Sequence, residues 1–172
     1  MPADIRLVPF TEDHLPGLVG MMTDPDVLRF TRVPDPPPAD FPRTWLTRYL
    51  NGRRDGTREA FAILDAAGGS FLGTAVVPKI EREAKTAELG YVVAPAARGR
   101  GVATAALGNL TAWAFSELDA RRLELIIRFD NEASKSVARR CGYQKEGVLR
   151  SLYLKQETWE DAEIWSRLST DP

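Results

Sequence analysis

The stretch that most constrains the fold is an apolar run, a glycine-rich loop and an apolar helix between residues 87 and 118. Residues 87–94 are apolar and β-branched in the middle, which predicts a buried strand. This strand ends at Pro95, because proline has no N–H for a sheet ladder. A tight glycine loop follows at Arg98–Gly101, and an amphipathic helix begins at Val102. This order places free backbone N–H groups at a helix N-terminus, which is a binding site for anions and above all for phosphates.

Several interpretations of this loop are open. A P-loop requires Gly-Lys-Ser/Thr, which is absent, and a dinucleotide fingerprint requires a third glycine where Thr104 stands. A third pattern, Arg-x-x-Gly-x-Ala, is matched by Arg98, Gly101 and Ala103. That pattern resembles the coenzyme A pyrophosphate loop of the GCN5-related N-acetyltransferases (GNATs). A βα turn whose glycines serve only its tightness fits the loop alone nearly as well, so the rest of the chain must decide.

Length, charge and composition narrow the class of protein. The 172 residues, 44% apolar and 27% charged, predict one soluble domain spanning residues 1–172. The net charge of −1 argues against a nucleic-acid-binding protein, because such proteins carry an excess of positive charge. No apolar run is long enough for a membrane span and no signal peptide is apparent, so a cytoplasmic protein is expected. One cysteine and one histidine exclude an internal disulfide and argue against a metal site.

The N-terminal half alternates between short strands and helices. A strand is predicted over residues 5–9, and a helix runs from the N-cap Thr11 to about residue 23. Residues 24–42 are rich in proline and predict a surface loop. A second helix, capped near Asp40, ends before Gly52; its aromatic residues belong to the core or wall a substrate pocket.

The C-terminal half is predicted to complete a sheet. A hairpin of two strands joins the strand over residues 87–94 in a three-stranded meander, and a later strand pairs in parallel with it through a crossover. The strands are predicted over residues 59–65, 70–77, 122–129, 143–151 and 152–168, with a charged connection over 78–85 and a turn near 156–161. Asn131 is the predicted N-cap of a helix over residues 132–141, which stops at Gly142.

Motifs along most of the chain extend the resemblance beyond the loop. They are Glu88–Pro95, Arg98–Ala103, Asn131–Ser134, Arg140–Tyr143, Glu146–Arg150 and Trp159–Asp161. In this order and spacing they resemble the ribosomal-protein alanine N-acetyltransferase (RimJ/RimL-type) branch of the GNATs. The resemblance implies an α/β GNAT fold: a mixed, mostly antiparallel sheet of six to seven strands, split by the coenzyme and flanked by about four helices.

The resemblance also implies which residues bind acetyl-coenzyme A. A main-chain N–H near Val92 or Val93 would polarise the thioester carbonyl. Asn131 would hydrogen-bond the pantetheine arm. The loop N–H groups would hold the diphosphate, from residues Arg98, Gly99, Arg100, Gly101, Val102, Ala103 and Thr104. The side chains of Arg98 and Arg100 add positive charge there or are simply solvated.

Two side chains are implied to act in catalysis. Glu88 matches the family's base, acting directly or through water; alternatively it is an edge carboxylate paired with Lys85 or Arg82. Many GNATs place a tyrosine acid where this chain has Ala138. Ser134 instead matches the serine of the alanine-acetyltransferase branch, and would give a hydrogen bond to the departing thiolate; alternatively it supports the helix cap.

The acceptor amine is less constrained. An α-amino group has a pKa of about 8 and lysine about 10.4, so a weak base favours an N-terminal or small-molecule amine over lysine. The resemblance favours a protein N-terminus. An antibiotic or metabolite acceptor is the alternative, with acidic walls from Asp24, Asp26, Asp35 and Asp40 if it is cationic. An alternative of another class is a non-catalytic acyl-coenzyme A sensor. Either a monomer or a homodimer is compatible with the sequence.

Overall fold

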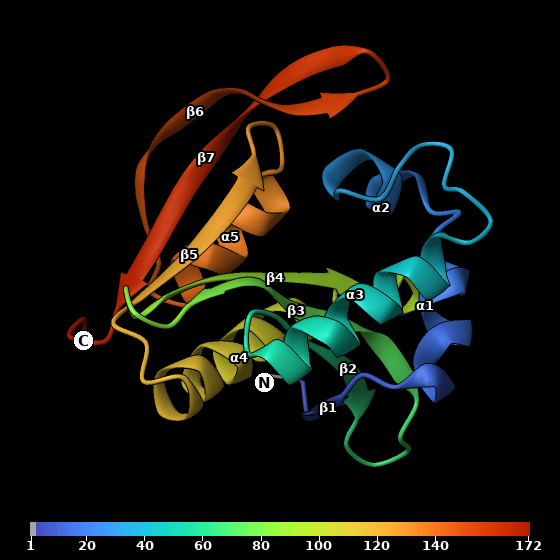
Figure 1. Ribbon diagram of the computed structural model, residues 1–172, viewed down its shortest axis with the longest axis horizontal. Coiled ribbons are helices and arrows are strands. Elements are labelled where there is room, and N and C mark those ends of the chain that lie inside the picture. The colour runs from blue at the N-terminus through green and yellow to red at the C-terminus, as the bar shows by residue number, and fades with distance from the viewer. Residues whose placement is uncertain (1–2) are drawn as a thin grey trace.

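The computed structural model describes residues 3–172, which form one seven-stranded sheet with five α-helices (Figure 1). The strand order is β1-β2-β3-β4-β5-β7-β6. The strands are β1 Ile5–Pro9, β2 Glu59–Asp65, β3 Phe71–Glu81, β4 Thr86–Val93, β5 Arg122–Arg128, β6 Gln144–Lys155 and β7 Thr158–Leu168. The helices are α1 Leu15–Met21, α2 Pro25–Phe30, α3 Phe41–Asp55, α4 Val102–Glu117 and α5 Glu132–Arg140.

Two apolar clusters sandwich the sheet, one on each face. Alternation along β2 divides its side chains between them: Phe61 and Ile63 join one cluster, and Ala60 and Ala62 join the other. The first cluster includes the buried residues of α4 and α5, and the second those of α1, α2 and α3. None of the helices among residues 3–172 is long and apolar enough to cross a membrane.

The parallel pair β4 and β5 separates part of the way along. All other neighbouring strands are antiparallel, including the expected meander of β2, β3 and β4. β4 and β5 pair only at Thr86–Arg122, Ala87–Leu123 and Glu88–Glu124. Beyond Glu88 the two strands diverge (Figure 1), so β4 presents a free edge from Leu89 to Val93. The predicted splitting of the sheet therefore begins at Glu88.

The segment over residues 24–42, predicted to be a loop, contains an additional helix. α2 begins at Pro25 because Asp24 caps it: the Asp24 carboxylate accepts a hydrogen bond from the Val27 N–H at 3.0 Å. The remaining part of this segment contacts the turn between β6 and β7, where Gln156 donates to the Asp35 carboxylate at 2.8 Å. The prediction counted prolines as helix breakers and missed that Asp-Pro is a favourable start for a helix.

Three element boundaries also differ from the predictions. α3 continues through Gly52 to Asp55. Glycine suits this position inside the helix because Arg58 packs closely against it: a Cβ at residue 52 would lie 2.4 Å from the Arg58 side chain. β3 continues through Pro78 to Glu81, because a register shift after Val76 removes the proline from the regular ladder. The final hairpin turns tightly at residues 156–157 and not over 156–161.

Candidate active site

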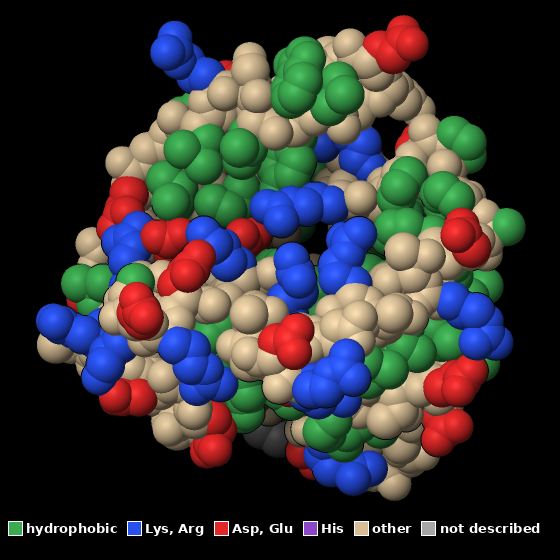
Figure 2. Space-filling view, viewed as in Figure 1, with side chains coloured by type: hydrophobic (Ala, Val, Ile, Leu, Met, Phe, Trp, Pro, Cys, Tyr) green, Lys and Arg blue, Asp and Glu red, His purple; other side chains and the backbone are tan. Residues whose placement is uncertain are grey.

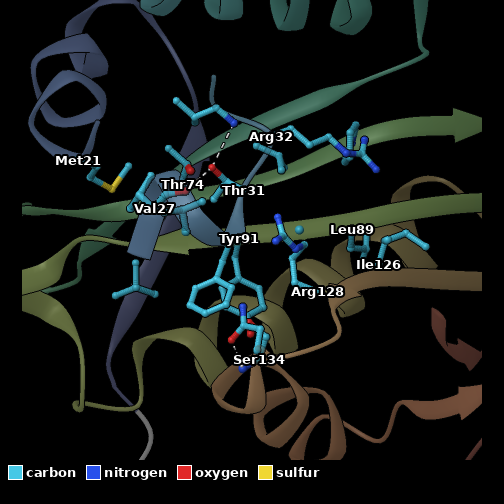
Figure 3. Close-up of a pocket in the computed structure, with 18 of the residues that line it drawn as sticks. Met21, Val27, Thr31, Arg32, Thr74, Leu89, Tyr91, Ile126, Arg128 and Ser134 are labelled. Carbon is cyan, nitrogen blue, oxygen red and sulfur yellow. Dashed lines mark hydrogen bonds between the residues drawn. The ribbon is translucent and has the colours of Figure 1, made fainter. Parts of the chain in front are cut away.

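The site is a cavity of about 500 Å³ at the divergence of β4 and β5. Helices α1, α2 and α3 line one side, residues of β3, β4 and β5 the floor, and α5 and β6 the other side. Figure 3 shows labelled side chains from α1, α2, β3, β4, β5 and α5 around a common space. Of the residues that the resemblance implied, the cavity is lined by Glu88, Val92, Val93, Arg98, Ala103, Asn131 and Ser134. The remaining loop residues lie outside its lining.

The glycine loop ends in a helix N-terminus without a side-chain cap. Gly101 is the N-cap, with φ of 78°, a left-handed conformation that favours glycine. The first intrahelical bond runs from the Ala105 N–H to the Gly101 carbonyl at 3.1 Å. The N–H groups of Val102, Ala103 and Thr104 therefore have no partner within the helix. They can bind an anion, although the Val102 side chain itself is buried in the core.

Arg98 is engaged by acidic residues of α2. Its guanidinium bonds Asp24 at 2.5 Å and Asp26 at 3.3 Å, and its Nε donates to the Val93 carbonyl at 3.3 Å. The hydrogen bond from Arg98 is the largest of the effects that hold the pKa of Asp24 below its usual value. Arg98 therefore ties the glycine loop to both α2 and β4. The positive charge of Arg98 is therefore balanced by two carboxylates, and its side chain is not simply solvated.

Glu88 lies where β4 leaves β5, with its side chain 19% exposed. Its partner is Arg32, which donates to Oε1 at 3.0 Å, and not the sequence-predicted Lys85 or Arg82. Burial raises the pKa of Glu88 above its usual 4.5, and the nearby Glu124 adds to the rise, whereas Arg32 opposes it. A carboxylate with a raised pKa is a stronger base than an exposed one, so Glu88 is suited to accept a proton.

The start of α5 brings polar groups to the opposite side of the cavity. Asn131 caps the helix by accepting the Ser134 N–H at 3.1 Å. Ser134 lies near Tyr91 in Figure 3. Burial raises the pKa of Tyr91 to about 12, against the smaller lowering effect of Ser134. The buried Tyr91 hydroxyl has no hydrogen-bond partner among residues 3–172. Ala138, by contrast, is fully buried in the core.

The cap itself gives a testable prediction. Replacing Asn131 with Ala removes the acceptor for the Ser134 N–H and should lower the free energy of unfolding by about 1 kcal/mol. Asn131→Asp keeps an acceptor at the same place and should retain most of the stability. Urea denaturation of the three proteins measures the difference. Equal midpoints for Asn131→Ala and the unmodified chain would contradict a stabilising cap.

Several cavity residues were missed by sequence reasoning. Arg32, Tyr49, Arg128 and Tyr153 come from separate regions of the chain and meet only in the folded protein. Arg32 and Arg128 both lie over the Tyr153 ring, at 5.6 Å and 5.3 Å from its centroid. No local motif marks these residues. Only the aromatic content of the second helix, noted as a candidate pocket wall, pointed to Tyr49.

The acidic wall considered for a cationic acceptor is largely absent. Of the four aspartates named for it, only Asp26 lines the cavity, and it is paired with Arg98. Asp24 is likewise paired with Arg98, and Asp35 accepts from Gln156 at the hairpin turn. Among residues 3–172, no three His, Cys, Asp or Glu side chains converge as a metal site.

Comparison with known proteins identifies the family to which this architecture belongs. A family model described as an acetyltransferase (GNAT) domain matches residues 4–144. The "Probable N-acetyltransferase YjcK" of Bacillus subtilis is 30% identical over 75% of this chain and 72% of its own length. The ribosomal-protein-serine acetyltransferase of Escherichia coli is 30% identical over 57% of this chain, and the match spans 55% of that enzyme. The solved structure of RimL, a ribosomal alpha-N-protein acetyltransferase in complex with coenzyme A, superposes with a TM-score of 0.87 at 21% identity, covering 96% of this chain and 94% of RimL.

The seven-stranded mixed sheet, its divergence at β4 and β5, and these matches define the fold of a GNAT acetyltransferase domain. The chain belongs to the GNAT acetyltransferase family and is similar to its RimJ/RimL-type branch. The predicted fold class is therefore confirmed.

Proposed function

We propose that this acetyltransferase moves the acetyl group of acetyl-coenzyme A directly onto a primary amine, with a protein N-terminal amine as the favoured acceptor. The observation that carries the proposal is that Glu88, the free edge of β4 and the capped start of α5 all line one cavity. The ribosomal-protein names of two similar proteins support a protein N-terminus as the acceptor.

The glycine loop is proposed to hold the coenzyme A diphosphate. The N–H groups of Val102, Ala103 and Thr104 lack helical acceptors and point along the α4 dipole, which favours an anion. Gly99 adds open space, since a Cβ there would contact nothing within 4 Å. Asn131 uses its oxygen in the α5 cap, so its amide NH₂ stays free to donate to a pantetheine carbonyl.

The free edge of β4 is proposed to polarise the thioester carbonyl, and strand alternation selects Val93. The Ala94 N–H bonds the Leu72 carbonyl of β3 at 2.8 Å. In an antiparallel pair the neighbouring residue directs its N–H and C=O away from the partner strand. The Val93 carbonyl accordingly accepts from Arg98 and not from β3. The Val93 N–H is thus aimed at the opening, where it can stabilise negative charge on the thioester oxygen.

Glu88 is proposed to accept the proton of the attacking amine, directly or through one water. The acetyl thioester supplies the electrophilic carbonyl carbon. The amine nitrogen forms a bond to that carbon, the carbon–sulfur bond breaks, and the nitrogen loses one proton to the Glu88 carboxylate. Ser134 donates a hydrogen bond to the departing thiolate from the first turn of α5, where the helix dipole favours negative charge. The thiolate then takes a proton from solvent water and leaves as coenzyme A, and Glu88 returns its proton to the solvent.

A small-molecule amine is the second candidate acceptor, and the size of the cavity favours it. A volume of about 500 Å³ lies within the usual range of small-ligand sites. A sensor that binds acetyl-coenzyme A without transferring the acetyl group is the alternative from another class. Glu88 with its raised pKa is a feature that a sensor does not require.

Two measurements test the proposal. Isothermal titration of acetyl-coenzyme A against coenzyme A should show binding of both. Thiol release with a panel of N-terminal peptides and small amines should then depend on the acceptor, and mass spectrometry should find the acetyl group on the α-amine. Binding without release for every acceptor would favour the sensor, and absence of binding would overturn the assignment of the glycine loop.

A further inference from the structure

The lining of the cavity carries several arginines. The charged residues that line the cavity are Arg32, Arg48, Arg58, Arg98, Arg128, Asp26 and Glu88. The two acidic residues are both engaged, Asp26 by Arg98 and Glu88 by Arg32. Figure 2 shows a hollow near the centre of this face, with Lys and Arg side chains gathered around it. The lining therefore has an excess of positive charge.

Tyr49 of α3 is influenced by both these arginines and Glu88. Burial raises the pKa of Tyr49 to about 12, and the charges of Arg32, Arg48 and Arg58 oppose the rise, while Glu88 adds to it. These four groups and Tyr49 all line the same cavity. An acceptor amine at Glu88 would therefore extend into a cavity lined by the same arginines.

Two of these arginines lack a carboxylate partner. Within residues 3–172, neither Arg48 nor Arg58 has an Asp or Glu oxygen within 4.0 Å. Arg58 donates from Nε to the Pro78 carbonyl at 3.1 Å, which fixes the side chain and leaves its terminal nitrogens free. Other arginines of the same region are paired, Arg43 with Glu12 and Arg53 with Glu59. We call Arg48 and Arg58 the arginine pair.

Arg128 adds a further buried cation on the floor of the cavity. Its side chain is 2% exposed, pairs with Glu160 and donates to the Arg29 carbonyl at 3.0 Å. Its Nε is buried and has no hydrogen-bond partner in residues 3–172. A buried donor without a partner costs free energy, which an acceptor atom of a bound ligand would recover.

We propose that the arginine pair binds a carboxylate of the acceptor, so that the preferred substrate is a primary amine with an acidic group a few atoms away. The inference rests on the proposed acetyl transfer at Glu88. The guanidinium group matches a carboxylate with two parallel hydrogen bonds, and the partial burial of Arg58 strengthens its attraction for a carboxylate. The positive charge also disfavours the ammonium form of the acceptor, which increases the neutral fraction that can attack.

Two sources can supply this chemistry: a protein N-terminus followed by Asp or Glu, and a small amino dicarboxylate. Kinetic assays with purified protein and acetyl-coenzyme A distinguish them. The peptide arm compares amidated Ser-Asp-Asp, Ser-Gly-Gly and Ser-Lys-Lys peptides, and the small-molecule arm compares glutamate with glutamine. Spermidine serves as a polycation. In the arm that contains the substrate, we expect kcat/KM to be at least about tenfold higher for the acidic member, because charge-assisted hydrogen bonds have this effect.

Variants then assign the preference to the arginine pair. Arg48→Gln and Arg58→Gln, singly and together, should reduce the acidic-to-neutral ratio of kcat/KM towards one, mainly through KM. Arg43→Gln is the matched control: Arg43 is on the same helix as Arg48, but it pairs with Glu12 and lies outside the cavity lining, so this variant should keep the ratio of the unmodified chain. The single variants are retained as a check, because Arg48 is exposed and its replacement should not disturb folding.

The outcomes separate this inference from the proposed function. Equal kcat/KM for acidic, neutral and basic acceptors, or a preference for spermidine, would overturn the inference while acetyl transfer stands. A preference that survives in the double variant would overturn the assignment to the arginine pair. Absence of thiol release with every acceptor would overturn the proposed function itself.

Discussion

Replacing Glu88 with Gln is expected to lower kcat/KM for acetyl transfer by a factor of about 10²–10⁴, the usual contribution of a general base. Gln retains the size of the side chain and an oxygen that can accept the hydrogen bond from Arg32, but it cannot take up the proton of the amine. The affinity for acetyl-coenzyme A should stay unchanged, because the glycine loop is at the other end of β4. Steady-state thiol release and isothermal titration measure the two quantities.

The pH dependence of the same step follows from the environment of Glu88. The carboxylate must be ionised to act, so kcat/KM should fall as the pH drops through its pKa in the folded protein, which lies above the usual 4.5. Glu124→Gln provides the control. Removing this neighbouring negative charge should lower the pKa of Glu88 and move the acidic limb to lower pH.

The contrary result is equally specific. If Glu88→Gln retains the kcat/KM of the unmodified chain, and its acidic limb does not change, then Glu88 does not act as the base. The arginine-lined cavity would then activate the amine by lowering its pKa alone, and transfer would depend on the pH of the solution in both proteins in the same way.

Replacing Gly73 with Ala is expected to be the most destabilising single change that the fold predicts. Gly73 lies on β3 opposite Val93, with φ of 150°, and a Cβ there would be 2.1 Å from the Val92 carbonyl oxygen. That oxygen is backbone and cannot move without displacing β4. Overpacking and backbone strain together should cost roughly 3 kcal/mol, which lowers the melting temperature by roughly 6–12 °C.

A second strand glycine is the matched control for this change. A Cβ added to Gly147 of β6 would meet no atom within 4 Å, and this glycine has no left-handed φ. Gly147→Ala should therefore be neutral or slightly stabilising. Calorimetry or urea denaturation compares both variants with the unmodified chain. An unfolding midpoint for Gly73→Ala equal to that of Gly147→Ala would contradict the close approach of β3 to β4.

Local signals were sufficient for the part of the site that lies within one strand–loop–helix unit. Strand β4, the glycine loop and α4 each depend on neighbouring residues: a β-branched run, a positive φ at Gly101 and apolar residues at helical spacing. The Asn131 cap is likewise a contact across three residues. Errors of local prediction arose where a strong rule was overruled, as at Pro25, which starts a helix, and Pro78, which continues a strand.

The acceptor side of the cavity could not be predicted in this way. Arg32, Arg58, Arg128 and Tyr153 are separated by tens of residues, and each sits in a segment whose local pattern is ordinary. The alternative pairing of Glu88 with Lys85 or Arg82 was wrong. Its partner Arg32 is 56 residues away in the sequence, and the path of the segment between α2 and α3 brings it to Glu88. Charge pairing of this kind depends on distance in space.

By itself the sequence determined the family, the order of the elements, the glycine loop and the strand that carries Glu88, because these features depend on the pattern and spacing of nearby residues. Only the tertiary structure decided where β4 leaves β5, which aspartates are already paired and which arginines stay without carboxylates. The physical reason is that pattern specifies local conformation, whereas the charge and shape of a cavity arise from the packing of distant segments.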